Sequence, residues 1–591
     1  SSHFGSSTAG KQRIRMESSQ LPRLDALVNG SPGLQLLERL LQERADPSQN
    51  LVFSPLNLAL TFGLLLPGLK ADSEELRSLL SFFGCTPACD AGSGTSKPSG
   101  TCRPEAMQSH MTDIFRALQA LTYALGPKTE LHTASLLGSD VEAAWIFSPE
   151  YLAILQSSFP NTRAEHSFDA GILNRWVSQQ TKGLIPSLVP PGSFTPSVPG
   201  ENINMFIASC LYFKATWTHK FNKHLTSQEW FYRTSRGAQA YDCQDRLGTD
   251  GQVDRVDMMQ CSFENGPGET KDVCYAKDVP LMLEDSLLER RTVHADFLLL
   301  PYNSHYAETT REKFRAVFIL PSCRGDASEH PLAEVEDVVA ALSQMYGAGS
   351  PLQGGGEPEK QVTATAKEPI EQDFKYGYNV GSALILKHTN PNGLAYRHGL
   401  VGHHLVRYRG ESTDLASWRE FPGSDADWLT KFRDTRPLTV IAQKRGLDHF
   451  LMQQQGYSLS KCMPLDVFIP KFKTDTRYEQ LKDTLFGPPF NLEPLNCFIP
   501  QFGHGNSVEV TKVIHQAVVE LDEDGTVATA ATVISMVEEE DEDWAEPPER
   551  NEFRCNRPFV FAIEDRDTGV FMFLGVISNP KGLAYATECK A

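Results

Sequence analysis

Few residues of this chain have the types and spacing that catalysis requires. No ordered set of Ser, His and Asp, no quartet of metal ligands and no glycine-rich phosphate loop stands out in its 591 residues. His515 is the one histidine in a regular pattern, because it alternates with Val513, Ala517 and Val519. This alternation predicts a strand with His515 on its buried face, so a core histidine is favoured over a catalytic one. The sequence therefore predicts a protein that is not an enzyme and that needs no cofactor and no metal.

The segment EDGTVATAAT is the second candidate for a functional site. It follows the alternating run Val508–Leu521 and precedes the acidic run Glu538–Asp543. Turns use Gly, Pro, Asn or Asp at set positions, whereas most residues of this segment are small or β-branched. Such side chains fit between strands without overpacking. The composition indicates a segment that is a loop in one state and a strand in another. We call it the hinge; its residues are Glu523, Asp524, Gly525, Thr526, Val527, Ala528, Thr529, Ala530, Ala531 and Thr532.

The sequence segments on both sides of the hinge resemble those of a known family. SVEVTKVIHQAVVELD precedes it, and RPFVFAIEDRDTGVFMFLGVISNP lies further along the chain. Together these segments resemble the reactive-loop hinge and C-terminal core of the serpins. The resemblance implies an α+β serpin fold of three β-sheets and about nine helices, with a mobile reactive-centre loop.

The resemblance also implies an activity. In the family, a serine or cysteine endopeptidase cleaves the loop, which then inserts into the main sheet with the acylated protease attached, so the chain would be an irreversible suicide inhibitor. About ten new ladder hydrogen bonds, at about 1 kcal/mol each, would supply on the order of 10 kcal/mol for distorting the enzyme. Small residues in the hinge favour this interpretation. The alternative is a non-inhibitory serpin that binds or stores another molecule, in which the loop never inserts.

The resemblance gives a position for the scissile bond. In inhibitory serpins it follows the acidic hinge residue by about sixteen residues, which corresponds here to Glu539–Glu540. This position predicts a protease that cleaves after acidic or small apolar residues, and the acidic run would repel trypsin-like enzymes. The other interpretation is that the acidic run only keeps an exposed loop soluble. Because the segment Glu539–Pro558 is longer than usual, a later bond such as Arg550–Asn551 is an alternative.

The region where the sheet opens is expected to contain Ser54, Asn174, His515 and Trp217. His515 would help to close the sheet, with Ser54 as its partner. Two nearby positions depart from the family pattern, because Asn57 replaces the usual Ser and Ser209 replaces the more frequent Asn. The second change puts the hydrogen bonding of His515 in question.

The remaining sequence predicts a core with insertions. Residues 1–32 are expected to be a polar N-terminal extension, 33–580 a serpin domain and 581–591 a C-terminal tail. Insertions are expected at about 84–105, 236–290 and 325–462, the last partly folded. An adhesive or scaffold role for the last insertion would require that it folds alone. An amphipathic helix is expected at Met111–Leu125 and a strand at Glu130–Leu136.

Composition narrows the partners. The net charge of −19 argues against nucleic acid and heparin-like polyanions. No run of about 18 or more apolar residues occurs, so no membrane span is expected. The expected partner is the target endopeptidase, and the chain is expected to be a monomer.

The compartment follows less directly from the sequence. Twelve cysteines are too sparse for a disulfide scaffold. Local bridges and free thiols are both open for the two groups in which cysteines cluster. The chain begins at Ser1 with no hydrophobic leader, so either a signal peptide was removed or the natural start is Met16. An extracellular or secretory location is favoured, with the cytoplasm as the alternative. The two clusters are Cys85, Cys89 and Cys102, and Cys243, Cys261 and Cys274.

Overall fold

The computed structural model gives the course of the core strands and helices and leaves the hinge beyond Thr526 undescribed. The described residues are 24–69, 73–84, 130–139, 149–159, 162–165, 169–190, 192–194, 205–235, 238, 253–264, 273–284, 290–303, 312–322, 332–346, 383–389, 395–401, 404–410, 419–420, 447, 451, 464–479, 481–492, 510–526, 550–566 and 568–581.

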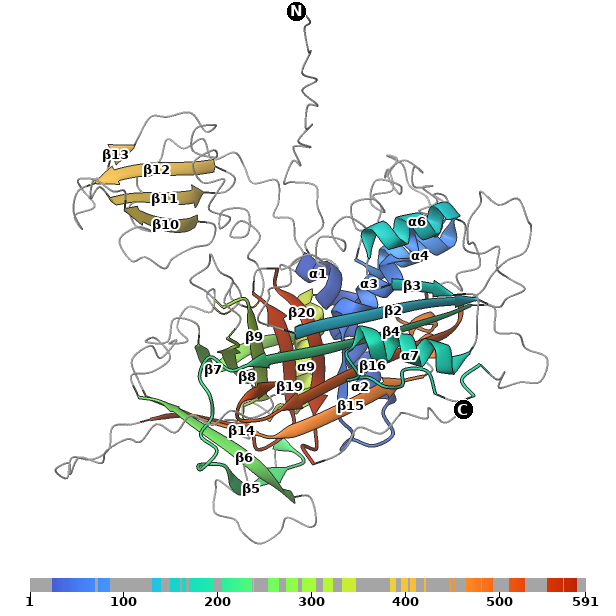
Figure 1. Ribbon diagram of the computed structural model, residues 1–591. Helices are drawn as coiled ribbons and strands as arrows, with labels where there is room; N and C mark the ends of the chain where they lie inside the picture. The colour runs from blue at the N-terminus through green and yellow to red at the C-terminus, as the bar shows by residue number, and fades with distance from the viewer. Residues whose placement is uncertain are drawn as a thin grey trace, which may run out of the picture.

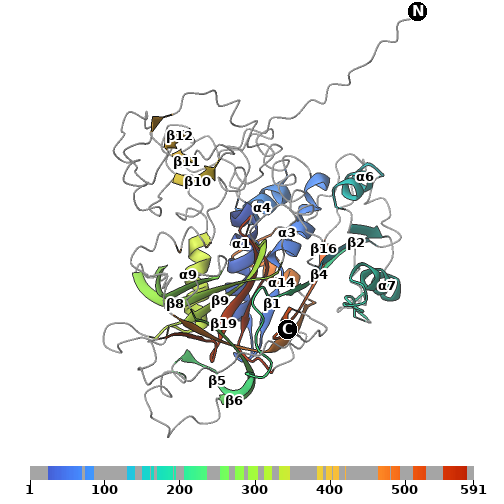
Figure 2. The same ribbon diagram turned by 60° about the vertical axis from the view of Figure 1, so that its left-hand side comes forward.

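The main sheet has six strands in the order β15-β16-β17-β4-β2-β3. Its central strand β4 is apolar almost throughout and is buried on both faces, which is why it lacks the alternation of a half-exposed strand. In Figure 2 these strands lie between helix α7 on one side and helix α3 on the other. The strands are β15 (Phe472–Tyr478), β16 (Val510–Leu521), β17 (Gly525–Thr526), β4 (Met205–Thr216), β2 (Glu130–Ser139) and β3 (Thr162–Glu165).

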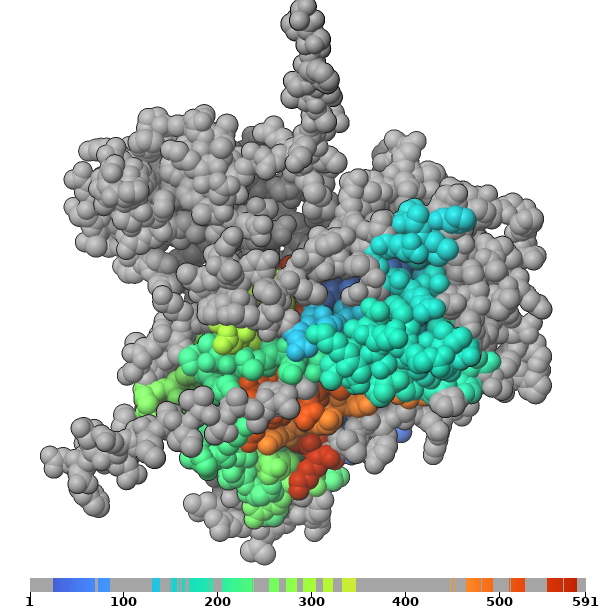
Figure 3. Space-filling model, in the orientation of Figure 1, coloured from blue at the N-terminus to red at the C-terminus, as the bar shows by residue number. Residues whose placement is uncertain are grey.

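Two separate clusters of buried side chains cover the two faces of this sheet. Met205, Ile207 and Leu211 of β4 belong to the large central core. Phe206 and Ala208 point to the opposite face, where they pack with residues of α7. Figure 3 shows this second face, with the teal atoms of the α7 segment beside the orange and red-orange atoms of β15 and β16.

Strands β16 and β4 are parallel neighbours over most of their length. Their register runs from Val510 opposite Met205 to Val518 opposite Tyr212. At one end the two-residue strand β17 pairs with both of them. Figure 1 shows β16 and β4 side by side in the middle of the sheet. We call this contact the β16–β4 boundary.

Three further sheets complete the described architecture. One has the order β1-β20-β19-β9-β8-β7 and another β18-β14-β6-β5, while β10-β11-β12-β13 form a sheet of their own. The strands are β1 (Leu51–Phe53), β5 (Ser227–Tyr232), β6 (Val253–Phe263), β7 (Cys274–Glu284), β8 (Arg290–Pro301), β9 (Phe314–Pro321), β10 (Ala383–Thr389), β11 (Ala395–Val401), β12 (His404–Gly410), β13 (Arg419–Glu420), β14 (Leu465–Pro470), β18 (Asn551–Arg554), β19 (Phe559–Asp565) and β20 (Val570–Ile577).

Three helices begin at side chains that cap their free N–H groups. Ser54 accepts a hydrogen bond from the N–H of Asn57, with Pro55 as the first residue of the helix, and Ser73 and Asp169 cap later helices in the same way. The helices are α1 (Leu24–Asn29), η1 (Gly30–Gln35), α2 (Leu36–Glu43), α3 (Pro55–Gly63), η2 (Leu66–Gly68), α4 (Glu74–Phe82), α6 (Pro149–Ser158), α7 (Ala170–Gln180), α9 (Val335–Tyr346) and α14 (Leu481–Phe486).

The architecture confirms the α+β class and the three expected sheets. The fourth sheet, β10–β13, is formed by residues of the long insertion. The described residues contain fewer α-helices than the nine or so expected. The expected strand at Glu130–Leu136 is β2, and the expected helix at Met111–Leu125 lies outside the described residues.

Two expected boundaries differ from the structure. Helix α1 begins at Leu24, within the expected polar extension, because Leu27 and Val28 are buried in the core. The expected insertion at 236–290 contains strands β6 and β7, which pair with core strands. Polar residues on their exposed faces had masked the pattern of these strands.

Candidate sheet-opening site

His515 connects three elements at the β16–β4 boundary. Its side chain is fully buried, and its Nε2 accepts a hydrogen bond from the backbone N–H of Ser54 at 3.0 Å. In a neutral imidazole Nδ1 must then carry the proton, which it donates to Oγ of Ser209 at 3.0 Å. Burial lowers the pKa of His515 to about 3, so the ring is neutral at physiological pH. The histidine thus ties β16 to β4 and to the start of α3.

The two departures from the family pattern have different consequences. Ser209 makes the contact to His515 through its hydroxyl, so the loss of an Asn at this position leaves no gap in the hydrogen bonding of the ring. Asn57 is fully buried, and neither its Oδ1 nor its Nδ2 has a hydrogen-bond partner among the described residues. An unsatisfied buried amide lowers stability.

Two of the hinge residues already lie within the sheet. Gly525 and Thr526 form β17, in which Thr526 pairs with Leu521 of β16 and with Ala215 of β4. The hydroxyl oxygens of Thr526 and Tyr302 are 2.7 Å apart. A Cβ atom at position 525 would lie 2.1 Å from the carbonyl oxygen of Ala215, so the close approach requires glycine.

Trp217 holds the turn that leads into the hinge. Its ring stacks on Tyr302 with centroids 4.5 Å apart, and its Nε1 donates to the carbonyl oxygen of Asp522 at 2.9 Å. Its backbone N–H donates to the carbonyl oxygen of Asp524 at 2.9 Å. The indole ring and the backbone N–H of Trp217 therefore bind the backbone on the two sides of Glu523.

Lysines bind the two acidic hinge residues. Lys471 Nζ lies 3.0 Å from Oε2 of Glu523, and Thr226 donates to Oε1 at 2.8 Å. Asp524 receives Lys220 at 3.0 Å and Lys223 at 2.5 Å. Because the lysines are partly exposed, water screens each pair and its contribution to stability is small.

These contacts set the charge of the hinge. Burial alone would raise the pKa of Glu523, but hydrogen bonds, including those from Thr226 and Lys471, hold it below its ordinary value. Burial would likewise raise the pKa of Asp524, but the hydrogen bonds from Lys223 and Lys220 outweigh burial and lower this pKa. Both carboxylates are therefore ionised at neutral pH.

The structure brings together only some of the residues expected here. Ser54 and His515 are in contact, whereas Trp217 lies at the hinge end of the boundary. All side-chain hydrogen bonds of Asn174 in the described part of the chain go to residues 187–189, so it ties α7 to the turn that follows. Sequence reasoning missed several residues, which come from segments far from the hinge and carry no local signal: Tyr302, Lys471, Lys220, Lys223 and Thr226.

The rest of the expected reactive segment is not described. Val527–Thr532 lie outside the described residues, as do Glu539 and Glu540. The next described residue is Arg550, which directly precedes β18 and bonds to two carboxylates. The alternative bond Arg550–Asn551 therefore lies at the edge of a sheet.

Comparison with known proteins identifies the family. The family model described as serpin (serine protease inhibitor) matches residues 28–348 and 442–580. The chain belongs to the serpin family. The resemblance drawn from the sequence is thereby confirmed, and the matched ranges leave out most of the long insertion.

Similar serpins include a human member and a plant member that is described as non-inhibitory. Human serpin B4 is 36% identical over 124 residues, which are 20% of this chain and 28% of that protein. A putative non-inhibitory serpin-10 from Oryza sativa subsp. japonica is 27% identical over 190 residues, 31% of this chain and 40% of that protein. The chain thus spans less than half of the length of these curated relatives.

A solved serpin has the same fold. Serpin-12 from Manduca sexta is matched with a TM-score of 0.50 and 14% identity, over 95% of this chain and 100% of that one. Within the described residues, no helix is long and apolar enough to cross a membrane, and no group of three or more His, Cys, Asp or Glu is arranged to bind a metal. Cys261 on β6 is a free thiol.

Proposed function

We propose that this serpin is an irreversible suicide inhibitor of a serine endopeptidase, with a cysteine endopeptidase as the second class of target. The observation that carries the proposal is the position of β17 between β16 and β4. The first two residues of an antiparallel strand are already in place at the boundary. Insertion after cleavage would extend this strand, so the first pairing of the loop with β16 and β4 need not be formed anew.

The register of β17 predicts where each loop residue would lie after insertion. Thr526 is opposite Ala215 on β4 and opposite Leu521 on β16. Continuing both antiparallel registers brings Thr532 between Ser209 and His515. The two extrapolations agree, because Ser209 and His515 already oppose each other. The inserted strand would end with Met536 opposite Met205.

The side chains of the loop fit this register. Ala528, Ala530 and Thr532 would point to the face of the central core, to which Phe213 and Leu211 of β4 belong. Small side chains can enter there without overpacking. The residues opposite them are Phe213, Leu211 and Ser209 of β4.

The same register supports Glu539–Glu540 as the scissile bond. After Met536 the inserted strand has reached the end of β4, and only Val537 and Glu538 remain before Glu539. A protease attached at Glu539 would be drawn close to the far end of the sheet. A protease attached at Arg550 would hang from a longer tether and would be compressed less.

The experiment is to mix the full chain with proteases of different specificity and to seek complexes that survive boiling in detergent. The panel contains Glu-selective, elastase-like, trypsin-like and papain-like enzymes, and mass spectrometry of the released C-terminal peptide locates the cut. We expect a stable complex with a Glu-selective or elastase-like enzyme and a new N-terminus at Glu540. Cleavage by every effective enzyme without any complex would contradict the proposal.

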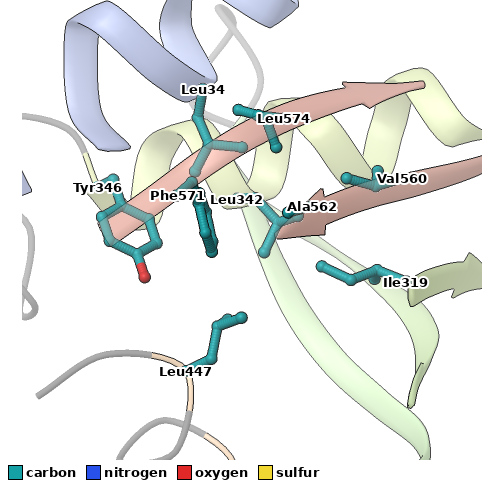
Figure 4. Close-up of a pocket in the computed structure, with 9 residues that line it drawn as sticks. All are labelled: Leu34, Ile319, Leu342, Tyr346, Leu447, Val560, Ala562, Phe571 and Leu574. Atoms are coloured by element: carbon teal, nitrogen blue, oxygen red, sulfur yellow. The ribbon is translucent and has the colours of Figure 1, made fainter. Parts of the chain in front are cut away.

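The second candidate is a non-inhibitory binding protein, because one of the similar serpins is described as non-inhibitory. A binding protein needs a cavity for its ligand, and the cavity between α9 and the sheet of β19 and β20 is unsuitable. Its volume is about 10 Å³, room for at most one water molecule. Figure 4 shows the apolar side chains that line it, among them Leu342, Phe571 and Leu447. This cavity gives no support to small-molecule storage.

A further inference from the structure

Strand β18 is the edge strand at which the chain re-enters the fold after the loop. It pairs in parallel with β14 from Asn551 opposite Leu465 to Arg554 opposite Phe468. The N–H of Asn551 also donates to the carbonyl oxygen of Pro464 at 2.8 Å. The backbone on the C-terminal side of Arg550 is therefore already engaged in a sheet.

Arg550 is bound by two carboxylates at the start of this strand. Its Nε and Nη2 lie 2.7 and 2.9 Å from the two oxygens of Asp466 on β14. Its Nη1 and Nη2 lie 2.7 and 3.0 Å from the two oxygens of Glu264, just after β6. Both contacts are bidentate, the strongest geometry for a guanidinium. We call this group the Arg550 clasp.

The environment of the clasp favours its charged form. Hydrogen bonds from Arg550 hold the pKa of Asp466 and of Glu264 below their ordinary values. Asp466 has a side-chain exposure of 20% and Glu264 of 68%, so the Asp466 contact is the stronger one. Ser262 donates to Oδ1 of Asp466 at 2.6 Å and positions it.

The other end of β18 is fastened by a second arginine. The guanidinium of Arg554 lies 3.6 Å from the centre of the Phe468 ring on β14, and it also bonds to Glu552 and Glu229. A short edge strand is easily detached when only backbone bonds hold it. Side-chain contacts at both ends make β18 a fixed root for the loop.

The sequence gives Arg550 a special position. No Lys or Arg occurs between Lys512 and Arg550, so the whole loop contains no basic residue. A protease that cuts after basic residues has only the Arg550–Asn551 bond to attack in this part of the chain. Such a protease must bind the arginine in its acidic pocket and the backbone on both sides in an extended form.

We infer that the Arg550 clasp is a specificity device, which withholds the one basic residue at the root of the loop from trypsin-like proteases. Asp466 and Glu264 bind the guanidinium that such an enzyme would need to bind. Strand β14 pairs with the backbone that follows Arg550. The meaning of this exclusion for target choice rests on the proposed inhibitory function. The protection of the bond itself does not.

The test is limited digestion of the native full chain with trypsin, followed by mass spectrometry for the fragment that begins at Asn551. The double variant Asp466→Asn with Glu264→Gln keeps Arg550 but weakens both contacts. We expect cleavage at Arg550 at least tenfold faster than in the unaltered chain. The control is Asp254→Asn on β6, which removes an exposed pair with Arg233 in the same sheet and should leave the rate unchanged.

Two further measurements keep the outcomes distinct. If the double variant unfolds, Glu264→Gln alone tests the inference, because Glu264 is exposed; we expect a threefold faster cut. Equal rates in the unaltered chain and the variants would overturn the inference, as would a detergent-stable trypsin complex formed at Arg550 by the unaltered chain. Trapping of a Glu-selective protease is measured separately. If no trapped complex forms, the proposed inhibitory function is overturned. Slow cleavage at Arg550 in the unaltered chain would still support the inference that the Arg550 clasp protects this bond.

Discussion

His515 on β16 and Ser209 on β4 lie directly opposite each other and bond across the boundary at which the sheet must open, with Nδ1 and Oγ 3.0 Å apart. A strand that enters between β16 and β4 must break this contact. The register of β17 brings Thr532 to the same place, so its hydroxyl could replace the lost bond.

The first prediction concerns which loop positions tolerate charge. Thr532→Glu would put a carboxylate between Ser209 and His515, facing the core, where an unpaired charge costs several kcal/mol. That cost removes much of the roughly 10 kcal/mol available from insertion. We expect the loop to be cut at an unchanged rate and the number of inhibitor molecules consumed per trapped protease to rise more than tenfold. Titration of protease activity measures this number.

The matched control is a charge on the opposite face of the same inserted strand. Val527→Glu would lie between Lys214 and Glu520, whose side chains are 30% and 40% exposed. A carboxylate there stays near water and beside Lys214, so the change should be less than twofold. Equal effects of the two variants would show that the register is wrong.

The second prediction is a pH dependence from His515. Its pKa is about 3 in the folded chain, below the ordinary value of 6.5. Between these values the unfolded chain binds one proton more, so the free energy of unfolding falls as the pH falls. The slope is about 1.4 kcal/mol per pH unit, which amounts to about 2 kcal/mol between pH 6.5 and 5.

His515→Gln removes this proton while keeping groups that can accept from Ser54 and donate to Ser209. Urea unfolding of both proteins across this pH interval gives the comparison. The variant should lose about 2 kcal/mol less than the unaltered chain on acidification. Parallel pH profiles for the two proteins would mean that His515 is not buried as a neutral ring.

The sequence was sufficient for strand β16 with its buried His515 and for the serpin core, because their signals are local. Alternation marks β16, and small residues mark the hinge. The lysines that bind Glu523 and Asp524 gave no signal, since Lys220, Lys223 and Lys471 are ordinary surface residues until the fold brings them together. The sequence offers Arg550 as a possible cut site because its partners, one on β14 and one after β6, lie far away in the chain.

The third prediction concerns the inserted start of the hinge. Gly525→Ala places a Cβ against the carbonyl oxygen of Ala215 and should expel β17 from the boundary. Tyr302→Phe removes the contact with the Thr526 hydroxyl, worth about 1 kcal/mol. Hydrogen exchange of the Thr526 amide should therefore rise strongly in the first variant and slightly in the second. Unchanged exchange in Gly525→Ala would contradict the placement of β17.

The fourth prediction concerns Asn57. Its buried amide has no partner among the described residues, and Leu has nearly the same shape. Asn57→Leu should therefore raise the free energy of unfolding by about 1–2 kcal/mol. A variant less stable than the unaltered chain would contradict this account of Asn57.

Thr61→Val is the opposing control for the same region. The Thr61 hydroxyl donates to the carbonyl oxygen of Asn57 at 2.6 Å and lies 3.2 Å from Oγ of Ser135. Its loss should lower the free energy of unfolding by about 1 kcal/mol. Opposite signs for the two variants would show that the satisfaction of polar groups, and not repacking, decides stability here.

The central claim is that the cleaved loop completes the main sheet, and the most direct test is the melting temperature before and after a single cut. A Glu-selective endopeptidase would cut the full chain near Glu539, and mass spectrometry would confirm one cut. About 10 kcal/mol of new strand pairing predicts a rise of at least about 10 °C. An unchanged melting temperature after complete cleavage would contradict insertion and leave the loop as a protease substrate.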